Sequence, residues 1–306
     1  MKKIFGIAMA MVAAFVVLYV AFRPTPEPRQ AAEEMTGAKP SQTSLEGPPV
    51  SEAASHSEAA ASDSEAAAES RTWLDHFKEG QASYSVGEYD SACCAFDRAI
   101  AGNSDNFYLH YMLGLSHWKN GRHERAAGAL NRSLELNPSF VKGWINLARV
   151  RRDLGDPQEA VALCEKALAI DESSDDALNV SGLAHLDAGD REKAIECFKS
   201  AISANPENAY ALNNLALTYI YQERYEDALL PLEQAVEIEP EVAFIHNNLG
   251  VVYERLGRTA DAAHQYAAAV DTPGGHSKAE ASLKRILPLL SVDEEARLAE
   301  FYQIER

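Results

Sequence analysis

Six asparagines are the residues whose type and spacing suggest a chemistry for this chain. They recur at multiples of thirty-four residues in two series, Asn146, Asn214 and Asn248 in one and Asn179, Asn213 and Asn247 in the other. A side-chain amide offers N–H donors and a carbonyl acceptor at once. A row of such amides can therefore hydrogen-bond the backbone of an extended peptide whatever its side chains are. This chemistry would recognise a polypeptide without catalysing a reaction.

The cysteines and histidines show no pattern typical of catalysis or metal binding. The four cysteines, at positions 93, 94, 164 and 197, form no C-x-x-C pair and no zinc-like spacing with histidine. A Gly-rich phosphate loop, a nucleophile elbow and an H-E-x-x-H helix are also absent from the sequence. We therefore expect no cofactor, no metal and no enzymatic activity. Two alternatives stay open: a disulfide between Cys164 and Cys197, and a metal pair of His110 and His117.

The elements that must position these side chains follow from an internal repeat. Six consecutive blocks of thirty-four residues, from Trp73 to His276, repeat one pattern of small and apolar residues. We number the positions of each block as slots 1 to 34. Slot 20 is always alanine, slot 8 is glycine or alanine, and slot 15 is glycine in five blocks. Small side chains let two helices approach closely and a glycine ends a helix, so each block predicts two antiparallel helices that meet near slot 15.

These slots resemble the tetratricopeptide repeat, whose signature has a Trp, a Leu-Gly pair and a Tyr early, then Ala, Phe, Ala and Pro. The third block shows the opening with Trp144, Leu147 and Ala148. The resemblance implies an all-α fold, a right-handed superhelix of six helix-turn-helix repeats over residues 73–276 with an inner groove. Residues 277–306 space their leucines helically and predict a C-terminal capping helix over the last repeat.

The resemblance also implies that slots 2, 5, 6, 9, 12 and 13 of each first helix build the groove wall. The asparagine row occupies slots 5 and 6. Apolar and aromatic residues accompany it on the same wall: Tyr210, Leu217, Tyr221, Phe244 and Val251. A basic cluster in the third block, Lys142, Arg149 and Arg152, is expected to hold an acidic side chain or a carboxyl terminus, unless these residues are merely solvated. We expect all of these residues to bind peptide.

The amino-terminal segment predicts a membrane anchor. After two lysines, an uncharged run from Ile4 to Phe22 comes close to the length that spans a bilayer. Bulky residues at its exit argue against cleavage, although a removed signal peptide remains the alternative for residues 1–22. The positive-inside rule favours repeats outside the cytoplasm, in the periplasm if the source is bacterial. Residues 23–72 are rich in Pro, Ala, Ser and Glu and predict a disordered linker, with partial helix left open over residues 51–69.

The net charge of the chain limits the classes of partner that it is expected to bind. The net charge is −18, most of it within the repeats, and such a surface repels nucleic-acid backbones. We therefore expect a membrane-tethered scaffold that binds an extended segment of a partner protein, in cell-envelope assembly or secretion. The alternative is a structural subunit that packs on a folded partner or associates with itself. Glycan binding by Tyr210, Tyr221 and the asparagines is a third, weaker hypothesis.

Overall fold

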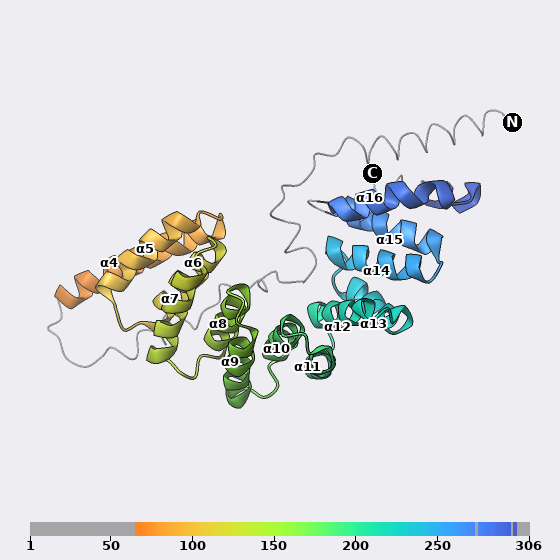
Figure 1. The fold of residues 1–306 in the computed structure, drawn as a ribbon. Helices are drawn as coiled ribbons and strands as arrows, with labels where there is room; N and C mark the ends of the chain where they lie inside the picture. Colours follow the sequence, from red (N-terminus) through yellow and green to blue (C-terminus); the bar gives the residue numbers. More distant parts are fainter. Residues whose placement is uncertain (1–64, 273–274, 295, 299–306) are drawn as a thin grey trace, which may run out of the picture. The chain divides into compact units, whose positions relative to one another are not determined.

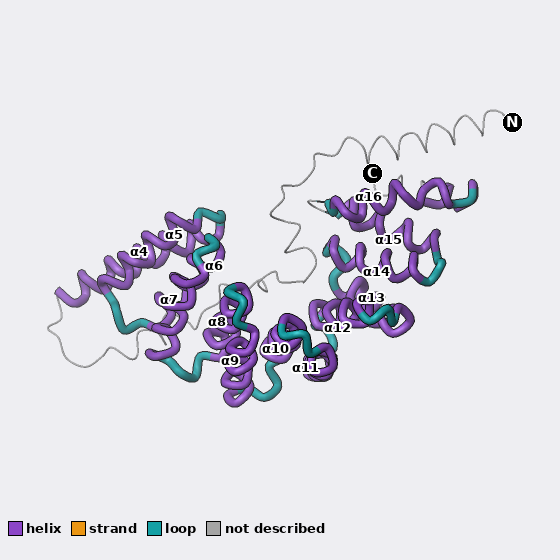
Figure 2. The backbone as a smooth tube through the Cα atoms, viewed as in Figure 1, coloured by secondary structure: helices purple, strands orange, loops and turns teal. Residues whose placement is uncertain are grey.

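The computed structural model describes residues 65–272, 275–294 and 296–298, and these residues form helices joined by short turns (Figures 1 and 2). No strand occurs in these ranges. The predicted all-α fold of consecutive helix-turn-helix pairs is therefore confirmed. The predicted anchor, residues 1–22, and most of the predicted linker lie outside the described residues.

The described helices belong to two compact units. The first, called the N-terminal unit, contains α4 (Glu65–Ser85), α5 (Tyr89–Gly102), α6 (Phe107–Lys119), α7 (His123–Leu136), α8 (Val141–Asp153), α9 (Pro157–Ile170), α10 (Asp175–Asp187) and α11 (Arg191–Ala204). The second, called the C-terminal unit, contains α12 (Ala209–Tyr221), α13 (Tyr225–Ile238), α14 (Ala243–Arg255), α15 (Thr259–Asp271), α16 (Ser277–Ile286) and the 3₁₀ turn η1 (Leu287–Leu289). Within each unit every helix packs against the next one along the chain.

The helix starts follow the repeat of the sequence. From α6 to α14, each first helix begins at slot 1, and from α5 to α15, each second helix begins at slot 17. Slot 34 precedes each first helix and is often a capping residue. Asn106 and Asn208 each accept a hydrogen bond from a backbone N–H in the first turn of α6 and α12, and Ser174 does the same for α10. Side-chain caps therefore support the starts of α6, α10 and α12, whereas α8 and α14 start at the same slot after Phe140 and Val242, which form no side-chain cap.

The turns between paired helices need a left-handed residue. The five slot 15 glycines have φ between 70° and 83°, a conformation in which a Cβ would be strained. The fifth block has Glu223 at this slot, and it adopts φ 58°. The turn is thus the same in all six blocks, at the cost of some backbone strain in the fifth.

The interior of each repeat is built from slots 8, 20, 24 and 27. All six slot 20 alanines and all six slot 24 side chains are fully buried. Slot 8 lies directly against slot 24: a Cβ added at Gly182 would come within 2.5 Å of the Phe198 ring, and one at Gly250 within 2.7 Å of the Tyr266 ring. The glycine therefore lets a large ring fill the space between the paired helices.

The ends of the array differ from the predicted boundaries. Helix α4 begins at Glu65, within the segment that was assigned to the linker. At the other end α16 stops at Ile286, because Pro288 cannot continue an α-helix, and helix resumes only at 292–294 and 296–298. The capping element is thus a short helix at the position of a seventh first helix, followed by a break.

An ion pair fastens α16 to the last full repeat. Arg285 donates two hydrogen bonds to the Glu254 carboxylate, at 2.7 and 2.8 Å, and the Tyr266 hydroxyl donates a third at 2.9 Å. The Arg285 guanidinium is the main reason that the pKa of Glu254 is lowered. Three helices, α14, α15 and α16, thus meet at one carboxylate.

None of the helices in the described part of the chain combines the length and the apolar character needed to cross a membrane.

A histidine cap makes the docking of α16 sensitive to pH. The Nδ1 atom of His276 accepts a hydrogen bond from the Ala279 N–H at 3.2 Å, and burial lowers the pKa of His276 to about 4, with a smaller contribution from the charge of Lys278. Because the folded pKa is below the unfolded value of about 6.5, the cap is fully effective above pH 6.5 and is lost as the pH falls towards 4.

We expect the C-terminal unit to lose about 2 kcal/mol of stability between pH 7 and pH 5 through this residue. The measurement is the difference in unfolding free energy between wild type and H276N, whose amide caps without titrating, at both pH values. An equal pH dependence of the two proteins would contradict the assignment.

Candidate functional site

The C-terminal unit presents a candidate binding surface on its first helices. We define the first-helix face as slots 2, 5, 6, 9 and 13 of α12 and α14, which pack against each other. Its residues are Tyr210, Asn213, Asn214, Leu217, Tyr221, Phe244, Asn247, Asn248, Val251 and Arg255. The rings of Tyr210 and Phe244 lie side by side, with centroids 6.1 Å apart. Tyr221 is 54% exposed, and Tyr210 and Val251 are half-buried. Leu217 and Phe244 are buried, each 7% exposed, so the accessible part of the face is formed by Tyr210, Tyr221 and Val251.

Most of the asparagines of this face are buried and hydrogen-bond one another. Asn213, Asn214 and Asn248 are buried, whereas Asn247 is half-buried. The Nδ2 atom of Asn248 donates to Asn213 Oδ1 at 2.8 Å, which joins α14 to α12. Longer contacts of 3.4 Å link Asn213 to Asn214 and Asn247 to Asn248. These amides therefore hydrogen-bond one another between repeats, and Asn247 is the member of the group with the most access to solvent.

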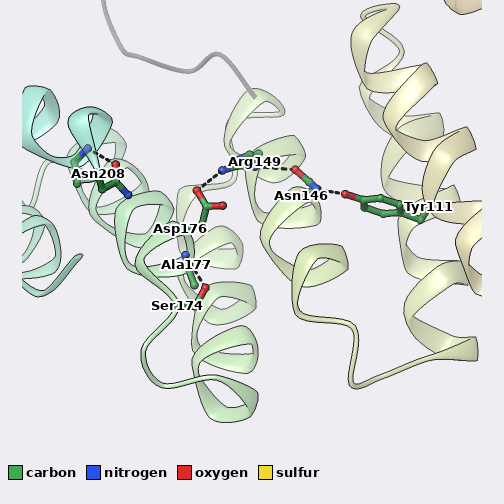
Figure 3. A network of polar contacts seen from close by, with 8 residues as sticks. Tyr111, Asn146, Arg149, Ser174, Asp176, Ala177 and Asn208 are labelled. Carbon is green, nitrogen blue, oxygen red and sulfur yellow. Dashed lines mark hydrogen bonds and ion pairs between the residues drawn. The ribbon is translucent and has the colours of Figure 1, made fainter. Parts of the chain in front are cut away.

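The N-terminal unit contains a related polar network, shown in Figure 3. Asn146 of α8 is buried and donates from Nδ2 to the Tyr111 hydroxyl of α6 at 2.9 Å. Its Oδ1 accepts from Arg149 at 3.0 Å, and Arg149 also lies 3.2 Å from Asp176 at the start of α10. Burial raises the pKa of Tyr111, so its hydroxyl stays protonated. The network connects three successive first helices.

The predicted basic cluster is largely neutralised. Arg149 pairs with Asp176, and Arg152 pairs with Asp187 of α10 at 2.7 Å. Both arginine side chains are nearly buried, whereas Lys142 is exposed and has no ion-pair partner among the described residues. Asn179 of α10 is buried on the same side of the repeats. Of the three residues of this predicted cluster, Lys142 alone has no ion-pair partner among the described residues. Each arginine already pairs with a carboxylate of the next repeat.

A chain of aromatic rings in the N-terminal unit was not among the predicted site residues. Phe77 of α4 lies 6.0 Å from Tyr108, Tyr108 lies 5.6 Å from Tyr111, and Tyr111 lies 4.8 Å from Phe140, all between ring centroids. Phe77, Tyr108 and Tyr111 occupy slots 5, 2 and 5 of the first two blocks. Applying the groove-wall slots to those blocks as well would have found them.

Buried cysteine and histidine side chains of the N-terminal unit contribute to its packing. Cys93 lies 3.4 Å from Nδ1 of His117, and both are buried. Burial raises the pKa of Cys93 to about 11 and lowers that of His117, so both side chains are neutral near pH 7. The four cysteines are free thiols, and the described residues contain no group of three or more His, Cys, Asp or Glu that could hold a metal ion.

The sequence matches one family model repeatedly. Residues 77–139, 111–177, 180–242 and 214–277 match the model described as Tetratricopeptide repeat. A curated relative, the Hsp70-Hsp90 organizing protein of Triticum aestivum, is 31% identical over 97 residues, which is 32% of this chain and 17% of the relative. The chain thus spans less than a fifth of that relative's length.

Solved structures share the fold at low identity. The Cut9–Hcn1 hetero-tetramer of the APC/C matches with a TM-score of 0.60 and 19% identity, over 71% of this chain and 43% of that one. Pseudomonas aeruginosa pilF matches with a TM-score of 0.55 and 20% identity, over 65% and 89%. A thermophilic repeat protein of the same kind from Thermus thermophilus matches with a TM-score of 0.51 and 24% identity, over 60% and 100%.

Proposed function

Because this chain belongs to the tetratricopeptide repeat family, we propose that it is a non-catalytic scaffold that binds an extended segment of a partner protein. One observation carries the proposal. On the first-helix face, the partly exposed side chains of Tyr210, Tyr221 and Val251 share one surface with buried amides that already bond one another. A surface of this kind offers apolar area to a ligand without requiring that its polar groups be desolvated.

The asparagines have two roles in this proposal. Asn247 reaches the surface and is the amide that contacts a bound backbone. Asn146, Asn213 and Asn248 act indirectly, because each holds one first helix against its neighbour. They position the face on which the ligand lies.

The name of the wheat relative supports a role in holding other proteins, since it is called an organizing protein of Hsp70 and Hsp90. We further propose that residues 1–22 tether the scaffold to a membrane and that the repeats lie outside the cytoplasm, in envelope assembly or secretion. This part rests on the sequence, on its uncharged run after two lysines and on the Pro-, Ala-, Ser- and Glu-rich segment that follows.

One observation favours the second candidate function, a structural subunit that packs on a folded partner or on its own copy. Leu289 and Val292, beyond the end of α16, are 69% and 62% exposed. These two side chains would be covered in a stable assembly through the C-terminal end, and such an assembly would leave the first-helix face unused.

A site-specific crosslinking experiment separates the two functions. A photo-crosslinking amino acid is placed in the full chain at position 251 on the first-helix face or at position 292, and adducts from native membranes are identified. We expect a single protein adduct from position 251, reduced at least tenfold by the second-site change Y221S. The matched control is L230S, which alters a leucine that is 62% exposed on the second helix α13.

The outcomes are distinct. An adduct from position 251 that Y221S removes and L230S leaves intact supports the scaffold. Adducts from position 292 alone, unaffected by Y221S, would show that the protein acts as a structural subunit. All variants must first show the same helical content and unfolding temperature.

A further inference from the structure

Three glutamates precede the two helices of the first-helix face, and we call them its negative edge. Glu207 precedes Tyr210 by three residues, and Glu241 precedes Phe244 by three residues, both at slot 33. Glu239 ends the second helix between them. All three are exposed, and none forms an ion pair with another residue of the described chain. The charge of these carboxylates is therefore not neutralised by an ion pair within the described part of the chain.

Several other carboxylates of the C-terminal unit are paired with a cation. Asp227 pairs with Arg224 at 2.6 Å and Asp261 with Arg258 at 2.7 Å, both three residues apart at the start of a second helix. Glu254 and Glu280 are paired as well, with Arg285 and Lys284. These four cations are thus committed elsewhere, and Arg255 lies over the Tyr225 ring. Among the described residues, none forms an ion pair with Glu207, Glu239 or Glu241.

One of these carboxylates lies near the aromatic pair of the face. Burial raises the pKa of Tyr210, and the charge of Glu239 raises it further. The ring of Tyr210 is half-buried and packs against that of Phe244, which is buried. A cation placed here would be attracted by the Glu239 carboxylate and by the accessible ring of Tyr210.

We infer that the partner segment bound by the first-helix face carries a lysine or arginine that sits over Tyr210 beside Glu207, Glu239 and Glu241, together with an apolar side chain that covers Val251. This inference rests on the proposed function and names the chemistry of its ligand. It follows from complementarity: the edge is negative and has no ion-pair partner among the described residues, whereas the accessible side chains Tyr210, Tyr221 and Val251 are aromatic or apolar.

The structural alternative is that these glutamates only favour the amino-terminal ends of α12 and α14 through the helix dipole. In that case their loss would lower stability slightly and would leave ligand choice unchanged. The two explanations are separated by a measurement of ligand preference.

The experiment uses the full chain and a random library of decapeptides that are acetylated and amidated, so that no terminal charge contributes. Bound peptides are sequenced for wild type and for E207Q/E239Q/E241Q. We expect wild type to enrich peptides that combine Lys or Arg with an apolar residue, and the variant to lose the Lys/Arg enrichment at least fivefold while it keeps the apolar enrichment.

The matched control is E223Q/E226Q/E237Q, which removes the same charge from exposed positions around α13. We expect it to keep the preference of wild type, since a general effect of net charge would act on both variants. Enrichment of apolar peptides without a Lys/Arg preference, or equal losses in both variants, would overturn the inference and leave the proposed function standing. A wild type that enriches no peptide at all would instead reject the proposed function, and this inference with it.

Discussion

Replacing Gly182 by valine is expected to cost the N-terminal unit about 3 kcal/mol or more of unfolding free energy. The first added carbon alone would lie 2.5 Å from the ring of Phe198 in the paired helix, and that ring is fully buried and has no free space to enter. Overpacking a close-packed interior forces side chains off their rotamers or moves the backbone. The gain in helix propensity over glycine, well under 1 kcal/mol, is too small to offset this.

The matched control is G128V in α7. A Cβ at Gly128 meets no atom within 4 Å, so the same change should be neutral or slightly stabilising there. Equilibrium unfolding of both variants in denaturant measures the difference. Equal stabilities for G182V and G128V would show that slot 8 does not require a small residue.

A double-mutant cycle tests the coupling of slots 8 and 24. The fifth block pairs Ala216 with Leu232, where the fourth pairs Gly182 with Phe198. We expect G182A/F198L to be more stable than the sum of its single changes predicts, by about 1 kcal/mol, since the smaller side chain makes room for the added methyl.

Replacing Asn146 by alanine is expected to destabilise the N-terminal unit by about 2 to 3 kcal/mol. The change leaves the buried Tyr111 hydroxyl without its donor and removes the acceptor of Arg149, a cation that is nearly buried. Removing one partner of a buried polar contact costs the desolvation of the other. The control is N131A, an asparagine on the exposed surface of α7, where alanine should be neutral or stabilising.

This comparison also separates two roles for the asparagine row. If Asn146 served only to touch a bound peptide, N146A and N131A would unfold at the same denaturant concentration. A cycle with Y111F measures the coupling directly, and we expect an interaction energy of about 1 kcal/mol between the two side chains. Additive effects of Y111F and N146A would contradict the inter-repeat role.

Much of the fold was predictable because its determinants are local and periodic. The slot 15 glycines and the slot 20 alanines act within one helix pair, and the capping residues at slot 34 act locally at the starts of α6, α10 and α12. The repeat also predicted which residues of α12 and α14 belong to the first-helix face, because residues seven apart on a helix lie on the same side. Glu223 shows the limit of the local rule: the turn persists without its glycine because the flanking helices impose it.

The sequence by itself determined the repeat, the paired helices and which slots of each helix lie together. Only the tertiary structure decided that Asn213 bonds Asn248, that Arg149 and Arg152 are paired with Asp176 and Asp187, and that Glu207, Glu239 and Glu241 find no ion-pair partner in the described part of the chain. Helical periodicity reports the side of the helix from which a side chain projects. It does not report whether a group on the next repeat, twenty-seven or thirty-five residues away along the chain, comes close enough to satisfy that side chain, because this depends on how neighbouring repeats pack.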